Sequence, residues 1–337
     1  MGAARRHARF DPTPAREDSP MRTSGIHHVT AICGDPQPNA DFYAGVLGLR
    51  LVKRTVNFDD PTTYHLYYGD ALGRPGTILT FFPWPGAPRG TRGVGQATAV
   101  AFAVPSGALD GWIERLAERA VEFDAIEERL GQRVLGLRDP DGLALELVEM
   151  PGAAAHAAWR EGPVPEALAI RGFQGVTLTV EGYDRTSALL VDAMGLERRD
   201  AARERFRYEA PGGEPGAFVD VVCAPGLRRG RIAAGTIHHV AFRAASDADQ
   251  AKWRARLAGA GMNVTPVMDR RYFRSIYFRE PGGVLFEIAT DPPGFALDER
   301  PEALGTGLML PEWLEPRRAY IEERLPRLRL SDPRPVA

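Results

Sequence analysis

The sequence has few cysteines, no marked excess of either charge and no long apolar run. Its 337 residues include only two cysteines, Cys33 and Cys223, so neither a disulfide framework nor a cluster of thiolate metal ligands is indicated. This cysteine usage favours a reducing cytoplasm. The formal net charge of −2 gives no electrostatic reason to expect nucleic acid or an anionic membrane as a partner. No apolar run approaches the roughly 20 residues needed to cross a bilayer.

The remaining composition is that of an ordinary globular protein, with 44% hydrophobic and 26% charged residues. The length suffices for two domains or for one duplicated unit. Residues 1–21 are rich in Arg, Ala and Pro and lack the apolar core of a secretory signal. We therefore predict a disordered N-terminal extension over 1–21, with Met21 as a second candidate for the start of translation.

A short histidine-containing segment occurs twice, about 210 residues apart. Residues 26–31 read Ile-His-His-Val-Thr-Ala, and residues 237–242 read Ile-His-His-Val-Ala-Phe. Four of the seven histidines of the chain fall in these two segments. A repeat that keeps a metal-competent residue in a strand-like context predicts a duplicated fold with a shared site.

Four related units follow one another along the chain. Apolar or alternating segments that are typical of buried strands open each unit, at residues 25–32, 96–104, 172–180 and 235–243. Helical patterns follow at 39–47, 108–120, 183–194 and 247–260. Two more short strands close each unit, at 64–68 and 77–82, 133–138 and 143–149, 205–209 and 217–223, and 275–279 and 284–289.

The sequence thus predicts an α+β fold of four βαβββ modules. We assign modules 1 and 2 to a first domain over 22–155 and modules 3 and 4 to a second domain over 168–292. A C-terminal tail over 293–337 is predicted to carry a helix near 310–325, whose apolar residues Trp313, Leu314, Ile321 and Leu325 would cover one face of the body.

Alignment of the four modules brings out two positions that could hold metal ligands. The first strands place His28, Ala99, Gly175 and His239 at one position, and the last strands place Thr80, Glu146, Asp220 and Glu287 at the other. Pairing modules 1 and 2 leaves two good ligands, and pairing modules 3 and 4 leaves one histidine with two carboxylates. Pairing modules 1 and 4 joins His28, His239 and Glu287, a set of two histidines and one carboxylate that favours non-haem Fe(II).

Two of these assignments leave alternatives open. Glu146 lies on an apolar strand much like that of Glu287, so the cost of burying a carboxylate does not separate them. Glu287 is preferred because its own module also supplies His239. In a regular strand, His27 and His238 would point away from the neighbouring ligands, whereas a bulge would let either residue reach the site.

At these residues the chain resembles the vicinal oxygen chelate superfamily, and within it the dioxygenases that cleave hydroquinone rings. The resemblance extends from about residue 25 to the tail helix. Its segments include Gly25-Ile26-His27-His28-Val29-Thr30, Tyr64-His65-Leu66-Tyr67-Tyr68, Gly73-Arg74-Pro75-Gly76-Thr77, Ile237-His238-His239, Arg271-Tyr272-Phe273 and Pro281-Gly282-Gly283-Val284-Leu285-Phe286-Glu287. It implies an Fe(II) enzyme that opens a dihydroxylated aromatic ring with O2.

The resemblance also implies roles for individual residues. His28, His239 and Glu287 would bind Fe(II). Catalytic or substrate-binding roles would fall to His27, Thr30, His238, Arg270 and Tyr277, and Arg271 competes with Arg270 for its role. Tyr277 and a histidine of the pair His27 and His238 are the expected proton carriers, and Arg270 would stabilise an anionic ring or product.

Two rival functions remain. A glyoxalase-like lyase or isomerase usually requires four protein ligands, and Thr80 at the fourth corner argues against it. A metal-free binding protein would have no reason to place His and Glu at equivalent corners. The expected partners are a small aromatic substrate and O2, with no nucleic acid and no membrane. Exposed sheet edges would leave room for a homo-oligomer.

Overall fold

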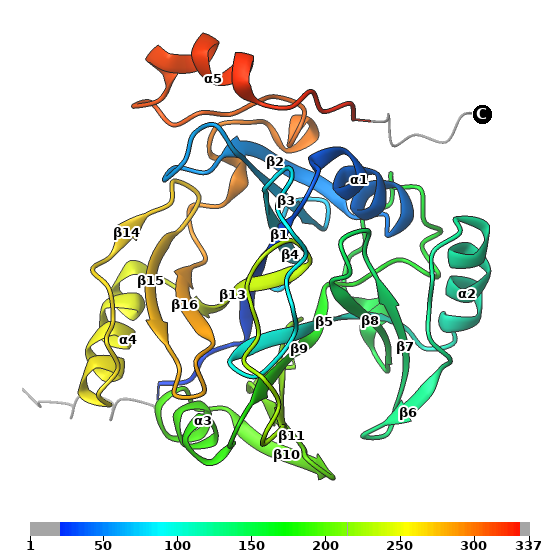
Figure 1. Ribbon diagram of the computed structural model, residues 1–337, viewed down its shortest axis with the longest axis vertical. Coiled ribbons are helices and arrows are strands. Elements are labelled where there is room, and N and C mark those ends of the chain that lie inside the picture. The colour runs from blue at the N-terminus through cyan, green and yellow to red at the C-terminus, as the bar shows by residue number, and fades with distance from the viewer. Residues whose placement is uncertain (1–20, 214, 331–337) are drawn as a thin grey trace, which may run out of the picture.

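Two eight-stranded sheets form the framework of the protein, and each takes one module from each half of the chain. The computed structural model describes residues 21–213 and 215–330. The first sheet has the order β14-β15-β16-β13-β1-β4-β3-β2, and the second has the order β10-β11-β12-β9-β5-β8-β7-β6 (Figure 1). The disorder expected for residues 1–21 concerns, apart from Met21, residues outside those described.

All four modules follow the predicted βαβββ order. Module 1 contains β1 (Ile26–Cys33), α1 (Pro36–Ala40), β2 (Arg50–Val56), β3 (Tyr64–Gly69) and β4 (Ile78–Pro83). Module 2 contains β5 (Gln96–Pro105), α2 (Leu109–Glu118), β6 (Glu127–Arg129), β7 (Gln132–Arg138) and β8 (Ala144–Met150). Module 3 contains β9 (Phe173–Val180), α3 (Asp184–Ala188), β10 (Glu197–Ala202), β11 (Arg205–Glu209) and β12 (Phe218–Cys223). Module 4 contains β13 (Thr236–Ala244), α4 (Asp247–Gly259), β14 (Met268–Asp269), β15 (Arg274–Arg279) and β16 (Leu285–Thr290).

The first strands of paired modules join the halves of each sheet. β1 runs antiparallel to β13 with Val29 opposite Val240, and β5 runs antiparallel to β9 with Val100 opposite Val176. The predicted pairing of modules 1 and 4 is therefore confirmed. The division into 22–155 and 168–292 follows the order of modules along the chain, whereas each sheet is built across it; these boundaries stay a prediction.

Each of the four joining strands bulges immediately before its site position. The residue left without a pairing partner is His27 in β1 and His238 in β13. In the second sheet the corresponding residues are Thr98 in β5 and Gln174 in β9. A bulge places two successive residues against one on the partner strand and redirects their side chains. Adjacent side chains of these strands can therefore approach each other, which a regular pleat would prevent.

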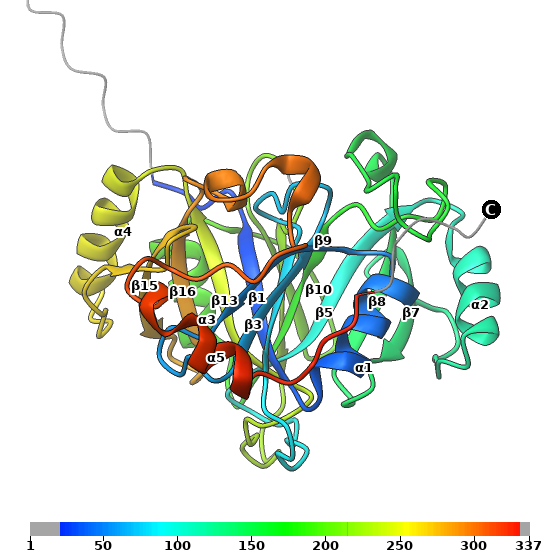
Figure 2. The same ribbon diagram turned by 90° about the horizontal axis from the view of Figure 1, so that it is seen from above.

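The helices lie on the outside of the sheets, with α4 and α2 at opposite ends of the molecule (Figure 2). The helix predicted over 39–47 begins earlier and is less regular than expected: α1 starts at Pro36 and continues directly as a π-helical turn, Asp41–Val46. A second π-helical turn, Leu189–Ala193, follows α3. Among the helices of the described residues, none has the length and apolar character needed to span a membrane.

The tail runs along β2 at the edge of the first sheet. The backbone amide of Met309 donates a hydrogen bond to the carbonyl of Arg54, and Leu308 forms an isolated parallel β-bridge with Arg54. The tail helix α5 (Arg318–Arg324) is shorter than predicted, because Pro316 does not fit the interior of an α-helix. The chain forms a single 3₁₀ turn there, Glu315–Arg317, before α5 begins. Three of its predicted apolar contacts, Leu314, Ile321 and Leu325, are buried, but Trp313 is 57% exposed.

Candidate metal centre and cavity

His28, His239 and Glu287 converge at the junction of modules 1 and 4. Their ligand atoms all lie within 4.8 Å of one another. Glu287 Oε2 is 2.9 Å from His239 Nε2 and 3.4 Å from His28 Nε2, and the two Nε2 atoms are 3.4 Å apart. All three side chains are buried. Three neighbouring strands of the first sheet, β1, β13 and β16, thus bring together the three residues predicted as ligands.

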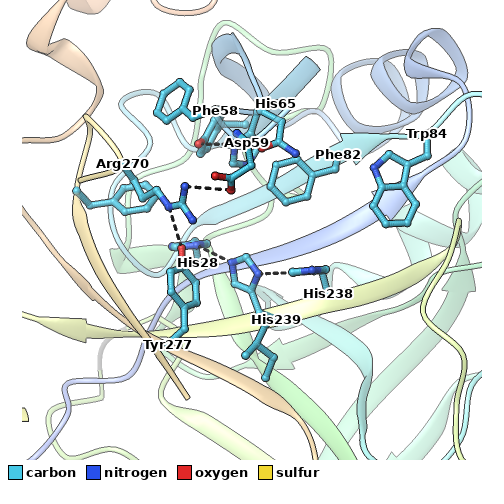
Figure 3. A pocket seen from close by; sticks show the side chains of 14 residues that line it. His28, Phe58, Asp59, His65, Phe82, Trp84, His238, His239, Arg270 and Tyr277 are labelled. Carbon is cyan, nitrogen blue, oxygen red and sulfur yellow. Dashed lines mark hydrogen bonds and ion pairs between the residues drawn. The ribbon is translucent and has the colours of Figure 1, made fainter. Parts of the chain in front are cut away.

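The second nitrogen of each imidazole is held by the preceding histidine. His27 Nδ1 lies 2.9 Å from His28 Nδ1. His238 Nδ1 likewise lies 2.7 Å from His239 Nδ1 (Figure 3). Burial lowers the pKa of His27 well below its ordinary value and lowers the pKa of His238 to about 3, so both rings are neutral near pH 7. A neutral partner at Nδ1 fixes the ring orientation and leaves Nε2 of His28 and His239 directed at Glu287.

The donor set fits a divalent metal ion. Glu287 Oε2 is fully buried and makes no hydrogen bond to any described residue other than its contacts with the two imidazoles, while Oε1 accepts from Ser275 Oγ. Burial by itself would raise the pKa of Glu287, but the neighbouring imidazoles of His28 and His239 outweigh it and lower the pKa well below its usual range. Donors that share one ion at about 2.1 Å lie within roughly 4 Å of one another. Two imidazoles and an ionised carboxylate satisfy this condition without rearrangement.

A cavity of about 280 Å³ opens beside these ligands. Its walls are largely aromatic, with Phe58, Phe82, Trp84 and Phe273 among the lining residues. Phe273 also packs against His28, with the ring centroids 4.9 Å apart. Hydrophobic rings around a few polar groups are typical of a site for one small, flat ligand.

Arg270 and Tyr277 form a polar pair on one side of the cavity. Arg270 Nε donates to the Tyr277 hydroxyl at 3.3 Å, and Arg270 Nη1 lies 3.3 Å from Asp59 Oδ2 (Figure 3). Burial and the charge of Glu287 raise the pKa of Tyr277, against the opposing effect of Arg270, so the phenol stays protonated. Arg271 is directed elsewhere and pairs with Asp298 at 2.8 Å. Of the two candidate arginines, only Arg270 lines the cavity.

Of the other predicted site residues, Thr30 and His27 lie behind the cavity wall or the ligands, and His238 lines the cavity. Thr30 is fully buried and hydrogen-bonds Thr80 at 2.9 Å, and it does not line the cavity. His27 supports His28 and is likewise absent from the lining, whereas His238 is present. The substrate-binding roles of Thr30 and His27 stay predictions.

The polar lining residues of the cavity that the sequence analysis did not single out are Asn57, Asp59, His65 and Tyr67. His65 and Tyr67 line the cavity from β3, and His65 Nδ1 lies 2.8 Å from the Tyr67 hydroxyl. His65 Nε2 in turn lies 2.8 Å from Thr80 Oγ1. Extending the module alignment to the penultimate strand would have found Tyr67, because Tyr67 faces Thr80 just as Tyr277 faces Glu287.

The corresponding position in the second sheet is filled by ion pairs. Glu146 binds Arg129, with Oε2 2.8 Å from Nη2, and Asp220 is held by Arg205 and Arg207. Ala99 and Gly175 stand where the first sheet has histidines. Glu146, the carboxylate that resembles Glu287 in sequence, is therefore balanced by arginine and lies in the other sheet.

Fold and site together define the class of protein. Residues 25–147 and 172–288 match the Glyoxalase/Bleomycin resistance protein/Dioxygenase superfamily, and the chain belongs to this superfamily, also known as the vicinal oxygen chelate superfamily.

Within the superfamily, the chain is similar to proteins named as ring-cleaving dioxygenases. It is 52% identical over 304 residues to "Putative ring-cleaving dioxygenase MhqO" of Bacillus subtilis, covering 90% of this chain and 96% of that protein. It is 37% identical to the chlorohydroquinone/hydroquinone 1,2-dioxygenase of Sphingobium indicum, covering 88% of this chain and 94% of that one. A crystal structure of a "putative dioxygenase" from Bacillus subtilis superposes with a TM-score of 0.88 at 50% identity, covering 92% and 99% of the two chains.

Proposed function

We propose that this protein is an Fe(II)-dependent dioxygenase that opens a dihydroxylated aromatic ring of the hydroquinone type with O2. The observation that carries the proposal is the convergence of His28, His239 and Glu287 beside an aromatic cavity. Two histidines and one carboxylate occupy one face of an ion and leave positions for substrate and O2, a pattern common to non-haem Fe(II) oxygenases. The relatives named as ring-cleaving dioxygenases support the same reaction class.

His28, His239 and Glu287 would hold the ion. Bound Fe(II) would supply one-electron chemistry with O2 and would acidify a coordinated phenol. Both atoms of O2 enter the product when the ring C–C bond next to a hydroxyl is cleaved, so the reaction needs no external reductant. The two supporting histidines, His27 and His238, would keep the ligand rings in place.

The cavity residues perform the remaining work. Phe82 and Phe273 would hold the flat ring and exclude water. Tyr277, protonated and bonded to Arg270, would donate a hydrogen bond or a proton to an oxygen of the substrate. Arg270 would stabilise negative charge on the ring or on the opened product, because a guanidinium stays charged and forms directed hydrogen bonds.

A glyoxalase-like reaction is the alternative within the superfamily. That chemistry generally uses a fourth protein ligand, and the fourth corner here is Thr80, whose hydroxyl is engaged by Thr30 and His65.

Both cysteines are free. This state suits a reducing compartment, and we propose the cytoplasm.

An oxygen-electrode experiment tests the proposal. The Fe(II)-loaded protein is supplied with hydroquinone, methylhydroquinone, chlorohydroquinone and catechol, and O2 uptake is measured with product analysis. With at least one of these substrates, we expect stoichiometric O2 consumption and formation of a ring-opened acid. Metal-dependent turnover of a hemithioacetal without O2 uptake would instead favour the lyase.

A further inference from the structure

Tyr67 is the counterpart of Tyr277 in the other half of the first sheet. Tyr277 on β15 lies opposite Glu287 on β16, and Tyr67 on β3 lies opposite Thr80 on β4. Thr80 holds in module 1 the position that Glu287 holds in module 4. Because β1 and β13 pair antiparallel, they relate the two modules by an approximate twofold axis, which directs the two tyrosines at the same cavity from different walls. His65, the partner of Tyr67, lies across the cavity from Tyr277 (Figure 3).

A chain of hydrogen bonds holds the Tyr67 hydroxyl. It runs from Tyr67 to His65 Nδ1 at 2.8 Å, from His65 Nε2 to Thr80 at 2.8 Å, and from Thr80 to Thr30 at 2.9 Å. Burial lowers the pKa of His65 well below its ordinary value, so its ring is neutral, with one donor and one acceptor nitrogen. If Tyr67 donates to His65, then His65 donates to Thr80 and Thr80 donates to Thr30. In the opposite direction Thr30 donates to Thr80, Thr80 donates to His65, and Tyr67 accepts from His65 and keeps its own proton for the cavity.

The cavity end of this chain has hydrogen-bonding capacity to spare. Within the described residues, the Tyr67 hydroxyl has a single hydrogen-bond partner, His65, although a phenol can both donate and accept. The ring of Tyr67 is held by His65 and Phe295, with centroid distances of 4.0 and 5.0 Å. Burial raises the pKa of Tyr67 well above its usual value, which keeps the group protonated. An oriented, protonated phenol at the wall is suited to a polar atom of the ligand.

We propose that Tyr67 binds the second hydroxyl of a para-dihydroxylated ring and so makes the site selective for hydroquinones over catechols. This inference rests on the proposed function, in which the first hydroxyl binds the metal. The two oxygens of a catechol are adjacent and can share one ion, whereas the second hydroxyl of a hydroquinone points away from the ion into the cavity that Tyr67 lines. A hydroxyl buried there without a partner would lose its hydrogen bond to water.

Anaerobic calorimetry on the Fe(II)-loaded protein tests this role, with hydroquinone, phenol and catechol as probes. The ratio of phenol Kd to hydroquinone Kd measures what the second hydroxyl contributes. We expect a ratio of roughly ten or more in the wild type, which is the usual effect of one buried hydrogen bond, and a ratio near one in Tyr67→Phe with unchanged phenol affinity and iron content. Tyr68→Phe is the matched control, because its hydroxyl donates to Asn39 on the other face of β3; its ratio should equal that of the wild type.

His65 acts through Tyr67 as a positioning residue. Its replacement in His65→Phe should lower the ratio, and His65→Gln, which retains a donor and an acceptor, should restore most of it. The role of Tyr67 is overturned if Tyr67→Phe keeps the wild-type ratio, if the wild type binds phenol as tightly as hydroquinone, or if it prefers catechol. The wild-type comparisons apply even if the variant does not fold. One further outcome separates the two proposals. If the Kd ratio falls to about one in Tyr67→Phe but the wild type opens no ring, the proposed function is contradicted, while the role of Tyr67 in binding the second hydroxyl is supported.

Discussion

The Nδ1 atoms of His27 and His28 lie 2.9 Å apart although the two residues are neighbours on one strand. The bulge at His27 makes this contact possible, and the bulge at His238 repeats it beside His239. A backbone irregularity thus supplies each candidate ligand with its own support. The same bulges persist at Thr98 and Gln174 in the second sheet, where no ligand follows, so they belong to the module and not to the metal centre alone.

Substitution of the carboxylate should remove the metal. We expect Glu287→Gln to lose stoichiometric Fe(II) and all ring-cleaving activity while keeping its fold, because a neutral amide is a poor ligand in place of a carboxylate. Metal content by mass spectrometry and circular dichroism provide the measurements. Glu146→Gln is the matched control from the second sheet, and it should retain the wild-type iron content. Equal iron content in the two variants would exclude Glu287 as a ligand.

Removal of a supporting histidine should weaken the site without abolishing it. His238→Ala is expected to lower Fe(II) affinity by roughly tenfold to a hundredfold, the usual effect of losing a group that orients a ligand. Competition with a chromogenic chelator measures the change. Gln174→Ala alters the equivalent bulge of the second sheet and should leave the affinity as it was. Affinity unaffected by His238→Ala would mean that the Nδ1 contact does not organise the ligand ring.

Loss of the Tyr277 hydroxyl should separate binding of the metal from turnover. Tyr277→Phe should keep its iron and lower kcat by roughly a hundredfold or more, as expected for a group that supplies a hydrogen bond or a proton during the reaction. Steady-state O2 uptake together with iron analysis gives both quantities. An unchanged rate would make Tyr277 a residue of the sheet with no part in the chemistry.

Stability should depend on pH through Asp139, which lies in the turn before β8. Burial, outweighing the hydrogen bonds from Leu143 and Tyr43, raises the pKa of Asp139 to about 6, compared with about 3.9 in an unfolded chain. The folded state therefore binds more protons between these values, and the contribution of Asp139 to stability is lost as the pH rises through about 6.

The variant Asp139→Asn stays neutral throughout this range. We expect its free energy of unfolding, relative to the wild type, to rise by on the order of 2 kcal/mol between pH 4 and pH 7. Urea titrations at several pH values measure the difference. Glu312→Gln, which removes an exposed carboxylate, should show no such trend. A difference that does not vary with pH would contradict the raised pKa.

The repeat in the sequence predicted the architecture and the ligand set because both follow from strand periodicity. The alignment makes Thr80 equivalent to Glu287, so the residues opposite them on the first strands should be equivalent too. In the structure Thr30 on β1 lies opposite Thr80, and Ala241 on β13 lies opposite Glu287. The position of His27 depended on a bulge, which period-two alternation does not reveal. The exposure of Trp313 depended on how the tail crosses the body, a packing relationship that the local pattern in the tail does not contain. The late start of α5 has a local cause, because Pro316 does not fit the interior of a helix.

The role of His65 was hidden for a different reason. An isolated histidine on a strand carries no signature of a site, and its meaning comes from Tyr67 and Thr80, which only the folded sheet places beside it. Arg270 and Arg271 were likewise equivalent in sequence. The backbone separates them, because Arg271 adopts a left-handed conformation with φ of 68° and turns toward Asp298.

The central claim is that one ion joins the first and last modules. Crystals of the protein loaded with Fe(II) without O2, measured on both sides of the iron absorption edge, test it most directly. We predict a single anomalous peak within bonding distance of His28 Nε2, His239 Nε2 and Glu287 Oε2. Fully loaded protein with its iron bound elsewhere, or with no peak between these three side chains, would contradict it.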